Sequence, residues 1–262
     1  MIHFVSNFGL APIIDDDTED PVGCGKGWLR RDFSLEPHGS LPFCSAFEFP
    51  TIPRSEWVER IKTKEKTKSR ISDIADQAGV KIKNQGNTNF CWCNAPVTCL
   101  ELIRAVQGEP YVELSPASVA CPINGFVNQG GWGTRALKYL MEHGAVPSRL
   151  WPSNAISREF DDAEANAERK KYRVSEWYDL EPGNFDQLAT ALLLGFPTAI
   201  GLSWWSHEVT AVELVKLDGD GRFGVLIQNS WGYDYGDRGR AVLTERKATP
   251  DDAVAPRSAV VS

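Results

Sequence analysis

The chain has 262 residues, and its 28 lysines and arginines stand against 35 aspartates and glutamates, a formal net charge of −7. This length suits one large core or two modest lobes, because single cores stop growing near about 250–300 residues. The acidic balance argues against a nucleic-acid surface, and the start of the chain lacks the basic and apolar runs of a signal peptide or membrane helix. We therefore expect a protein or peptide substrate, and no nucleic-acid or membrane partner.

Residues 1–50 are expected to form an acidic N-terminal extension, because they hold eight acidic and three basic residues and show little periodicity. Glycines between Gly23 and Gly27 predict turns. Two interpretations stay open. The extension is either a strap packed on the surface or a segment that covers a groove or docks a protein partner.

Residues 51–262 are expected to form the main domain. Near its start, the run from Arg60 to Arg70 holds six basic residues and one acidic residue, Glu65. Such a run is typical of a solvated helix or loop, and a contact with an acidic protein partner is the alternative.

Gln85 stands six residues before Cys91 and Trp92, which brings a candidate amide donor ahead of a candidate thiol nucleophile. Apolar residues recur at steps of three and four from Trp92 to Gln107 and predict a helix that begins at the sulfur. Free backbone N–H groups and the helix dipole favour the reactive thiolate there. Pro96 predicts a kink or a late helix start, because proline cannot donate a hydrogen bond.

Further helices are expected before residue 152. Ser115 and Pro116 are typical of a helix cap followed by a first-turn proline. The segment from Thr134 to His143 has an apolar face and is followed by Gly144, a common helix stop. These patterns predict a mainly helical lobe of about residues 84–152.

The second half of the chain changes its period. After expected helices at 161–171 and 184–194, strands are expected at 198–205, 208–216, 223–228 and 241–244, with a hairpin turn at 218–221. These patterns predict a mainly β lobe of about residues 153–262.

Two later residues have the chemistry that a thiol nucleophile needs. His207 lies in a strand-like run and could act as the base. Asn229, which opens Asn229-Ser230-Trp231-Gly232, can accept from one imidazole nitrogen and fix the orientation of the ring.

The chain resembles the papain-like, C1-type cysteine peptidases, and more narrowly their small disulfide-free bacterial and phage members. The resemblance is carried, in family order, by Gln85, Cys91-Trp92, Leu114-Ser115, Gly130-Gly131, His207 and Asn229-Ser230-Trp231-Gly232 with Gly236 and Gly239. It implies an α+β, two-lobe fold, with a helical lobe, an antiparallel β-barrel-like lobe and an active-site groove between them.

The same resemblance implies a role for each site residue. Cys91 would attack the substrate, Gln85 would donate to the oxyanion, His207 would shuttle the proton and Asn229 would orient His207. The implied substrate-binding residues are Gly130, Gly131, Trp132, Trp231 and Glu208, of which Trp231 also shields the His207–Asn229 hydrogen bond. Glu208 suggests a preference for basic side chains in a neighbouring pocket.

The cysteines argue against metal binding and against secretion. Cys91, Cys93, Cys99 and Cys121 do not form the two-plus-two spacing of a zinc site, and no second histidine follows His207-Glu208 at the spacing of a zinc peptidase. We expect neither a metal nor a cofactor. Secreted relatives usually carry disulfides near the active site, whereas Thr88 and the Val127-Asn128 region lack those cysteines. The expected location is therefore a reducing cytoplasm, of a bacterium or an infected host cell, or a virus particle.

The sequence predicts a cysteine endopeptidase that hydrolyses peptide bonds through a thioester intermediate. Pairing of thiolate with imidazolium at neutral pH is expected to accompany this chemistry. The alternative is a non-catalytic structural or binding protein with the same fold, such as a phage virion component. Transfer of the acyl group to an amine instead of water is a third possibility.

Overall fold

The computed structural model describes residues 11–17, 25–41, 44–219 and 221–261. Its strands form one sheet with the order β1-β7-β6-β5-β4-β8-β3-β2. The strands are β1 (Ile13–Ile14), β2 (Cys44–Ala46), β3 (Val174–Leu180), β4 (Thr198–Leu202), β5 (His207–Lys216), β6 (Phe223–Gln228), β7 (Arg240–Thr244) and β8 (Asp252–Ala259).

Both edges of this sheet are formed by the N-terminal extension. β1 pairs parallel with β7 at one edge, and β2 pairs parallel with β3 at the other. The strands between these edges, in the order β7-β6-β5-β4-β8-β3, all pair antiparallel with their neighbours. Since unpaired edge strands invite association with other chains, the extension covers two edges that the rest of the chain would leave open.

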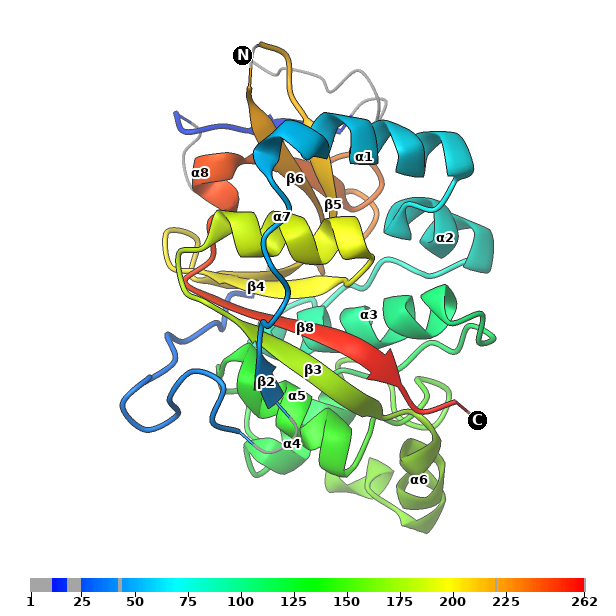
Figure 1. Ribbon diagram of the computed structural model, residues 1–262. Coiled ribbons are helices and arrows are strands. Elements are labelled where there is room, and N and C mark those ends of the chain that lie inside the picture. The colour runs from blue at the N-terminus through cyan, green and yellow to red at the C-terminus, as the bar shows by residue number, and fades with distance from the viewer. Residues whose placement is uncertain (1–10, 18–24, 42–43, 220, 262) are drawn as a thin grey trace.

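Helices pack on this sheet (Figure 1). They are α1 (Arg54–Thr67), α2 (Ile71–Ala78), α3 (Cys91–Val106), α4 (Ala117–Ile123), α5 (Gly133–Glu142), α6 (Ala163–Glu168), α7 (Phe185–Leu194) and α8 (Glu245–Ala248), with 3-10 turns at Arg158–Phe160 and Arg169–Lys171. α1 lies beside α7, whereas α4 and α5 lie at the opposite end of the molecule, near β2 and β3.

Helix α3 is the buried support of the molecule. It packs along β5 and β8 and also contacts α2 and α5. Every residue from Cys91 to Ala105 is buried, and the charged side chains among them, Glu101 and Arg104, form ion pairs with Lys83 and Glu109. A helix held on all sides keeps its first residue, Cys91, in a fixed position.

Most expected elements are present. The helices expected at 92–107, 134–143 and 184–194 begin and end within one residue of α3, α5 and α7. Of the two outcomes expected from Pro96, the late helix start is wrong, because α3 begins at Cys91 and contains Pro96 in its second turn, and the kink stays a prediction. The helix expected at 161–171 is shorter, since α6 covers only Ala163–Glu168 and a 3-10 turn follows it.

Two central strands were not expected from the sequence. β3 contains Asp179, and β8 contains Asp252 and Pro256, residue types that are uncommon inside strands. Among the described residues, no helix is long and apolar enough to cross a membrane.

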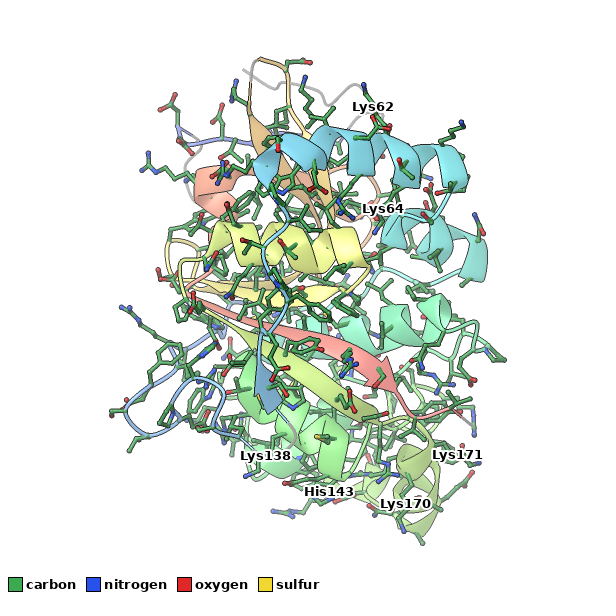
Figure 2. The ribbon with its side chains drawn as sticks, in the orientation of Figure 1. Lys62, Lys64, Lys138, His143, Lys170 and Lys171 are labelled. Carbon is green, nitrogen blue, oxygen red and sulfur yellow. The ribbon has the colours of Figure 1, made fainter. Side chains whose placement is uncertain are left out.

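The basic run from Arg60 to Arg70 falls mainly on α1. Figure 2 shows Lys62 pointing away from the body while Lys64 lies between α1 and α7, where its Nζ donates to the carbonyls of Leu192 and Leu193. Part of the run therefore caps the end of a neighbouring helix, and its contact with an acidic partner stays a prediction.

Candidate active site

Cys91 is the first residue of α3 and is fully buried. Its Sγ accepts a hydrogen bond from the backbone N–H of Gly27 at 3.3 Å, and the backbone N–H of Glu208 lies near enough to act on the pKa of the thiol. Because Glu208 directly follows His207, the sulfur lies against the start of β5, where the candidate base is held.

His207 and Asn229 are hydrogen-bonded to each other. His207 Nε2 lies 2.8 Å from Asn229 Oδ1, which also accepts from the backbone N–H of Ser230. The indole of Trp231 stacks on the imidazole, with ring centroids 4.7 Å apart, and Trp205 meets the same ring edge-on. Two aromatic rings therefore exclude water from this pair, which strengthens the hydrogen bond that orients the histidine.

Gln85 is fixed by the segment that carries Asn229. Its Oε1 accepts from Ser230 Oγ, and its backbone N–H donates to the Ser230 carbonyl at 2.8 Å. Its Nε2 donates to the carbonyls of Thr88, at 2.9 Å, and of Gly25, at 2.7 Å. One N–H of the expected oxyanion donor is therefore bonded to a carbonyl of the N-terminal extension.

Residues 25–31, which we call the groove segment, lie across the candidate nucleophile. The backbone of the segment pairs with Gly131, which donates to the Gly27 carbonyl at 2.9 Å and accepts from the Leu29 N–H at 2.8 Å. A β-carbon on Gly27 would lie 2.0 Å from the Asn89 carbonyl oxygen, and one on Gly25 would lie 2.1 Å from that of Thr88. Only glycine fits at these two positions, so the segment is matched to the surface it covers.

The residues predicted to bind substrate differ in how they contact the N-terminal extension. Gly130 and Gly131 contact the segment backbone, and Trp132 Nε1 donates to Glu36 of the extension at 2.9 Å. Trp231 contacts His207, and Glu208 is buried beside Cys91. Of the two interpretations of the extension, the covered groove is the one that the geometry favours.

Burial under the groove segment changes the chemistry of Cys91. Burial, and then the nearby Glu208 carboxyl, raise the pKa of the Cys91 thiol to about 12. The expectation of a thiolate at neutral pH is therefore wrong for this covered arrangement, in which desolvation outweighs the donors around the sulfur.

Sequence reasoning missed an ion cluster beside the groove. Arg31 donates to both carboxylate oxygens of Asp179 at 2.9 Å and to Asp252 Oδ1 at 3.3 Å, and the Arg31 and Asp179 side chains have no exposed surface. Asp179 and Asp252 lie on β3 and β8, the two strands that the sequence pattern did not reveal. A buried arginine inside an acidic extension gives no periodic signal in the sequence.

Comparison with known proteins gives a consistent result. A model of the papain family of cysteine proteases matches residues 70–211, more than half of the chain. Chymopapain from Carica papaya is 24% identical over 186 residues, which cover 63% of this chain and 51% of that protein. Cathepsin S from Bos taurus is 23% identical over 215 residues, which cover 71% and 63%. The chain thus spans between half and two thirds of the length of these curated relatives.

Solved structures share the fold. Xylellain, a cysteine protease from Xylella fastidiosa, matches with a TM-score of 0.63 at 15% identity and covers 90% of this chain and 96% of that one. Bromelain from Ananas comosus matches with a TM-score of 0.57 at 19% identity and covers 68% and 94%. These likenesses, at less than 25% identity, concern the fold.

Proposed function

Because this chain belongs to the papain family of cysteine proteases, we propose that it is a cysteine-type peptidase that hydrolyses peptide bonds in proteins or peptides. The observation that carries the proposal is the pairing of His207 Nε2 with Asn229 Oδ1 at 2.8 Å beside the strand that contacts the Cys91 sulfur. A nucleophile, a base and an orienting amide are the three parts that covalent catalysis by a thiol needs.

In the proposed reaction, Cys91 attacks the substrate carbonyl after the groove has opened and His207 has taken the thiol proton. Negative charge develops on the carbonyl oxygen, and the Nε2 of Gln85, now released from Gly25, donates to it. Removal of one such donor typically costs about 10²–10³ in turnover. His207 then protonates the leaving amine, and water hydrolyses the thioester between substrate and Cys91.

We also propose that the described arrangement is latent. The N–H of Gly27 donates a hydrogen bond to the sulfur of Cys91, and the carbonyl of Gly25 accepts one from the Nε2 of Gln85. A substrate needs both groups, so the groove segment has to leave before a peptide can bind. This assigns the extension a partner within its own chain.

A reducing compartment is part of the proposal, because the mechanism requires a reduced Cys91. The described cysteines Cys44, Cys91, Cys93, Cys99 and Cys121 are all free, which supports it. The phage or virion setting and the narrower resemblance to small bacterial and phage members stay predictions.

The test compares full-length variants in peptide hydrolysis and in labelling by E-64, the inhibitor bound to bromelain in the Ananas comosus structure. We expect Gly27→Ala, which cannot seat the groove segment against Asn89, to gain both activities. The exposed neighbour gives a matched control, Arg30→Ala, which is expected to behave as the original chain does. Gly27→Ala combined with Cys91→Ala is expected to lose both activities while its circular dichroism spectrum is unchanged.

Two outcomes would contradict the proposal. Undiminished cleavage after Cys91→Ala would exclude this thiol as nucleophile. A folded Gly27→Ala variant that neither cleaves peptides nor reacts with E-64 would favour the non-catalytic binding protein instead.

A further inference from the structure

Beneath the groove segment, two carboxylates flank a glycine of the sheet. Gly201 on β4 is paired with Glu208 on β5 and with Asp252 on β8. Residues directly opposite one another in antiparallel pairs project from the same face. Glu208 and Asp252 therefore stand on either side of the space that Gly201 leaves empty.

The indole of Trp28 fills this space. A β-carbon on Gly201 would lie 2.2 Å from Trp28 Nε1, so the ring rests directly on the glycine. The wall toward α5 is Gly133, where a β-carbon would lie 2.5 Å from Glu208 Oε1 and 3.1 Å from Val254. Trp28 is only 5% exposed, so removal of the groove segment leaves an open pocket of its size.

Trp28 does not satisfy the polar groups of its own pocket. Among the described residues, Trp28 Nε1 has no acceptor, and the Glu208 oxygens have no donor beyond the nearby backbone N–H of Gly133. Glu208 is 2% exposed. A carboxyl group buried without a matching donor is costly, and a cation within hydrogen-bond distance relieves that cost.

The cation of this region belongs to the extension. Arg31 bridges Asp179 and Asp252, with Nη1 2.9 Å from Asp179 Oδ1 and 3.3 Å from Asp252 Oδ1. When the groove segment leaves, Arg31 leaves with it. Glu208, Asp252 and Asp179 then face the groove without the positive charge that partners two of them in the covered state.

Resting on the peptidase activity proposed above, we propose that this pocket selects a basic side chain, arginine or lysine, at the substrate residue that takes the place of Trp28. The apolar stem of such a residue lies over Gly201, in the space of the indole, and its charged head lies between Glu208 and Asp252. A long side chain fits because the glycine gives the pocket depth. The groove segment itself places a cation on one of these two carboxylates, since Arg31 donates to Asp252.

The pocket is tested by binding and not by turnover, so its failure is distinct from failure of the peptidase proposal. Full-length Gly27→Ala/Cys91→Ala protein is titrated with fluorescent peptides that carry arginine, citrulline or tryptophan at each position in turn of an alanine background. Citrulline has nearly the shape of arginine without its charge. At one position we expect arginine to bind at least about tenfold more tightly than citrulline, since hydrogen bonds between charged groups are about twice as strong as neutral ones.

Two further variants assign that preference to the carboxylates. Glu208→Gln keeps the size of the side chain and is expected to reduce the arginine-to-citrulline ratio to about one, and Asp252→Asn is expected to reduce it by a smaller factor. Thermal unfolding checks that each variant is folded. Equal affinity for arginine and citrulline, tighter binding of tryptophan, a ratio unchanged by both variants, or no binding of any peptide would each overturn the proposal.

Discussion

Buried carboxylates occur in two regions of this molecule, and their partners differ. In the interior, Glu101 accepts from Lys83 Nζ at 2.7 Å and from the Leu114 N–H at 2.6 Å. Also in the interior, Glu213 accepts from the Ser72 N–H at 3.1 Å, and Lys64 lies near enough to influence its pKa. The partners of both carboxylates come from the main domain and not from the N-terminal extension.

In the groove, the partner of the carboxylates is removable. Asp179 and Asp252 are bonded by Arg31 of the groove segment, and Glu208 has no cation at all among the described residues. The difference indicates two roles for the buried carboxylates. A carboxylate matched within the body stabilises the fold, whereas one matched by a removable segment, or left unmatched, is available to a ligand.

The largest effect on stability is expected when an interior partner is removed. Lys83→Ala leaves Glu101 buried without its cation, and loss of one partner of a buried pair typically costs about 3–5 kcal/mol. Urea unfolding followed by tryptophan fluorescence measures this loss. The matched control is Lys81→Ala two residues away, because its pair with Glu113 is exposed to solvent and is expected to contribute little to stability. Equal losses of stability in the two variants would contradict the claim that the buried carboxylate Glu101 depends on its cation.

Removal of the groove cation is expected to act on access and not on the whole fold. Arg31→Ala loses hydrogen bonds between charged groups worth about 2 kcal/mol to the groove segment, which corresponds to about 30-fold more frequent opening. The rate of Cys91 alkylation by iodoacetamide measures it, with exposed Arg30→Ala as control. If the alkylation rate stayed constant while the free energy of unfolding fell as far as in Lys83→Ala, Arg31 would stabilise the whole fold and would not control access to Cys91.

A smaller effect concerns pH. Burial raises the pKa of Glu213 to about 7, against opposing effects of Lys64, Arg70 and the Ser72 N–H. Between about pH 4.5 and 7 the folded protein keeps this proton while the unfolded chain, with a pKa near about 4.3, releases it. Stability therefore falls as pH rises through this window, by at most about 1.4 kcal/mol per pH unit.

Substitution separates the two regions in the same pH window. Glu213→Gln is expected to remove its part of this slope in urea titrations from pH 5 to 8, and a slope identical to that of the original chain would refute the assignment. Burial also raises the pKa of Asp252 to about 7. The contribution of Asp252 to the pH dependence of stability is expected to shrink in Gly27→Ala, where the groove segment no longer covers Asp252. The contribution of Glu213 is expected to stay the same.

The sequence predicted the family and the fold, and both predictions are confirmed. It could do so because the residues that carry the chemistry lie in short local patterns: Gln85 with Cys91, and Asn229 with Trp231. These patterns also place elements, since α3 must begin at Cys91 and the strand with His207 must lie near it. Local patterns of this kind can be recognised in a single sequence.

The charged pocket could not be predicted in the same way. It depends on the register that sets Glu208 and Asp252 opposite Gly201, and on an arginine that is distant in sequence from both carboxylates. Pairing of strands far apart in the chain leaves no periodic trace, and β8 is masked further by Pro256 and its alanines. Of the carboxylates in this pocket, only Glu208, which is adjacent to His207, was predicted from the sequence as a binding residue.

The extension is joined to the sheet on both sides of the groove segment, through β1 at one edge and β2 at the other. An occupant tethered in this way faces its site at an effective concentration that does not change with the amount of protein. Dilution therefore cannot open the groove, and a competing peptide must exceed this local concentration. A single cut within residues 25–41 would leave each half still paired to the sheet, so the cut would unfasten the segment without releasing a free inhibitory peptide.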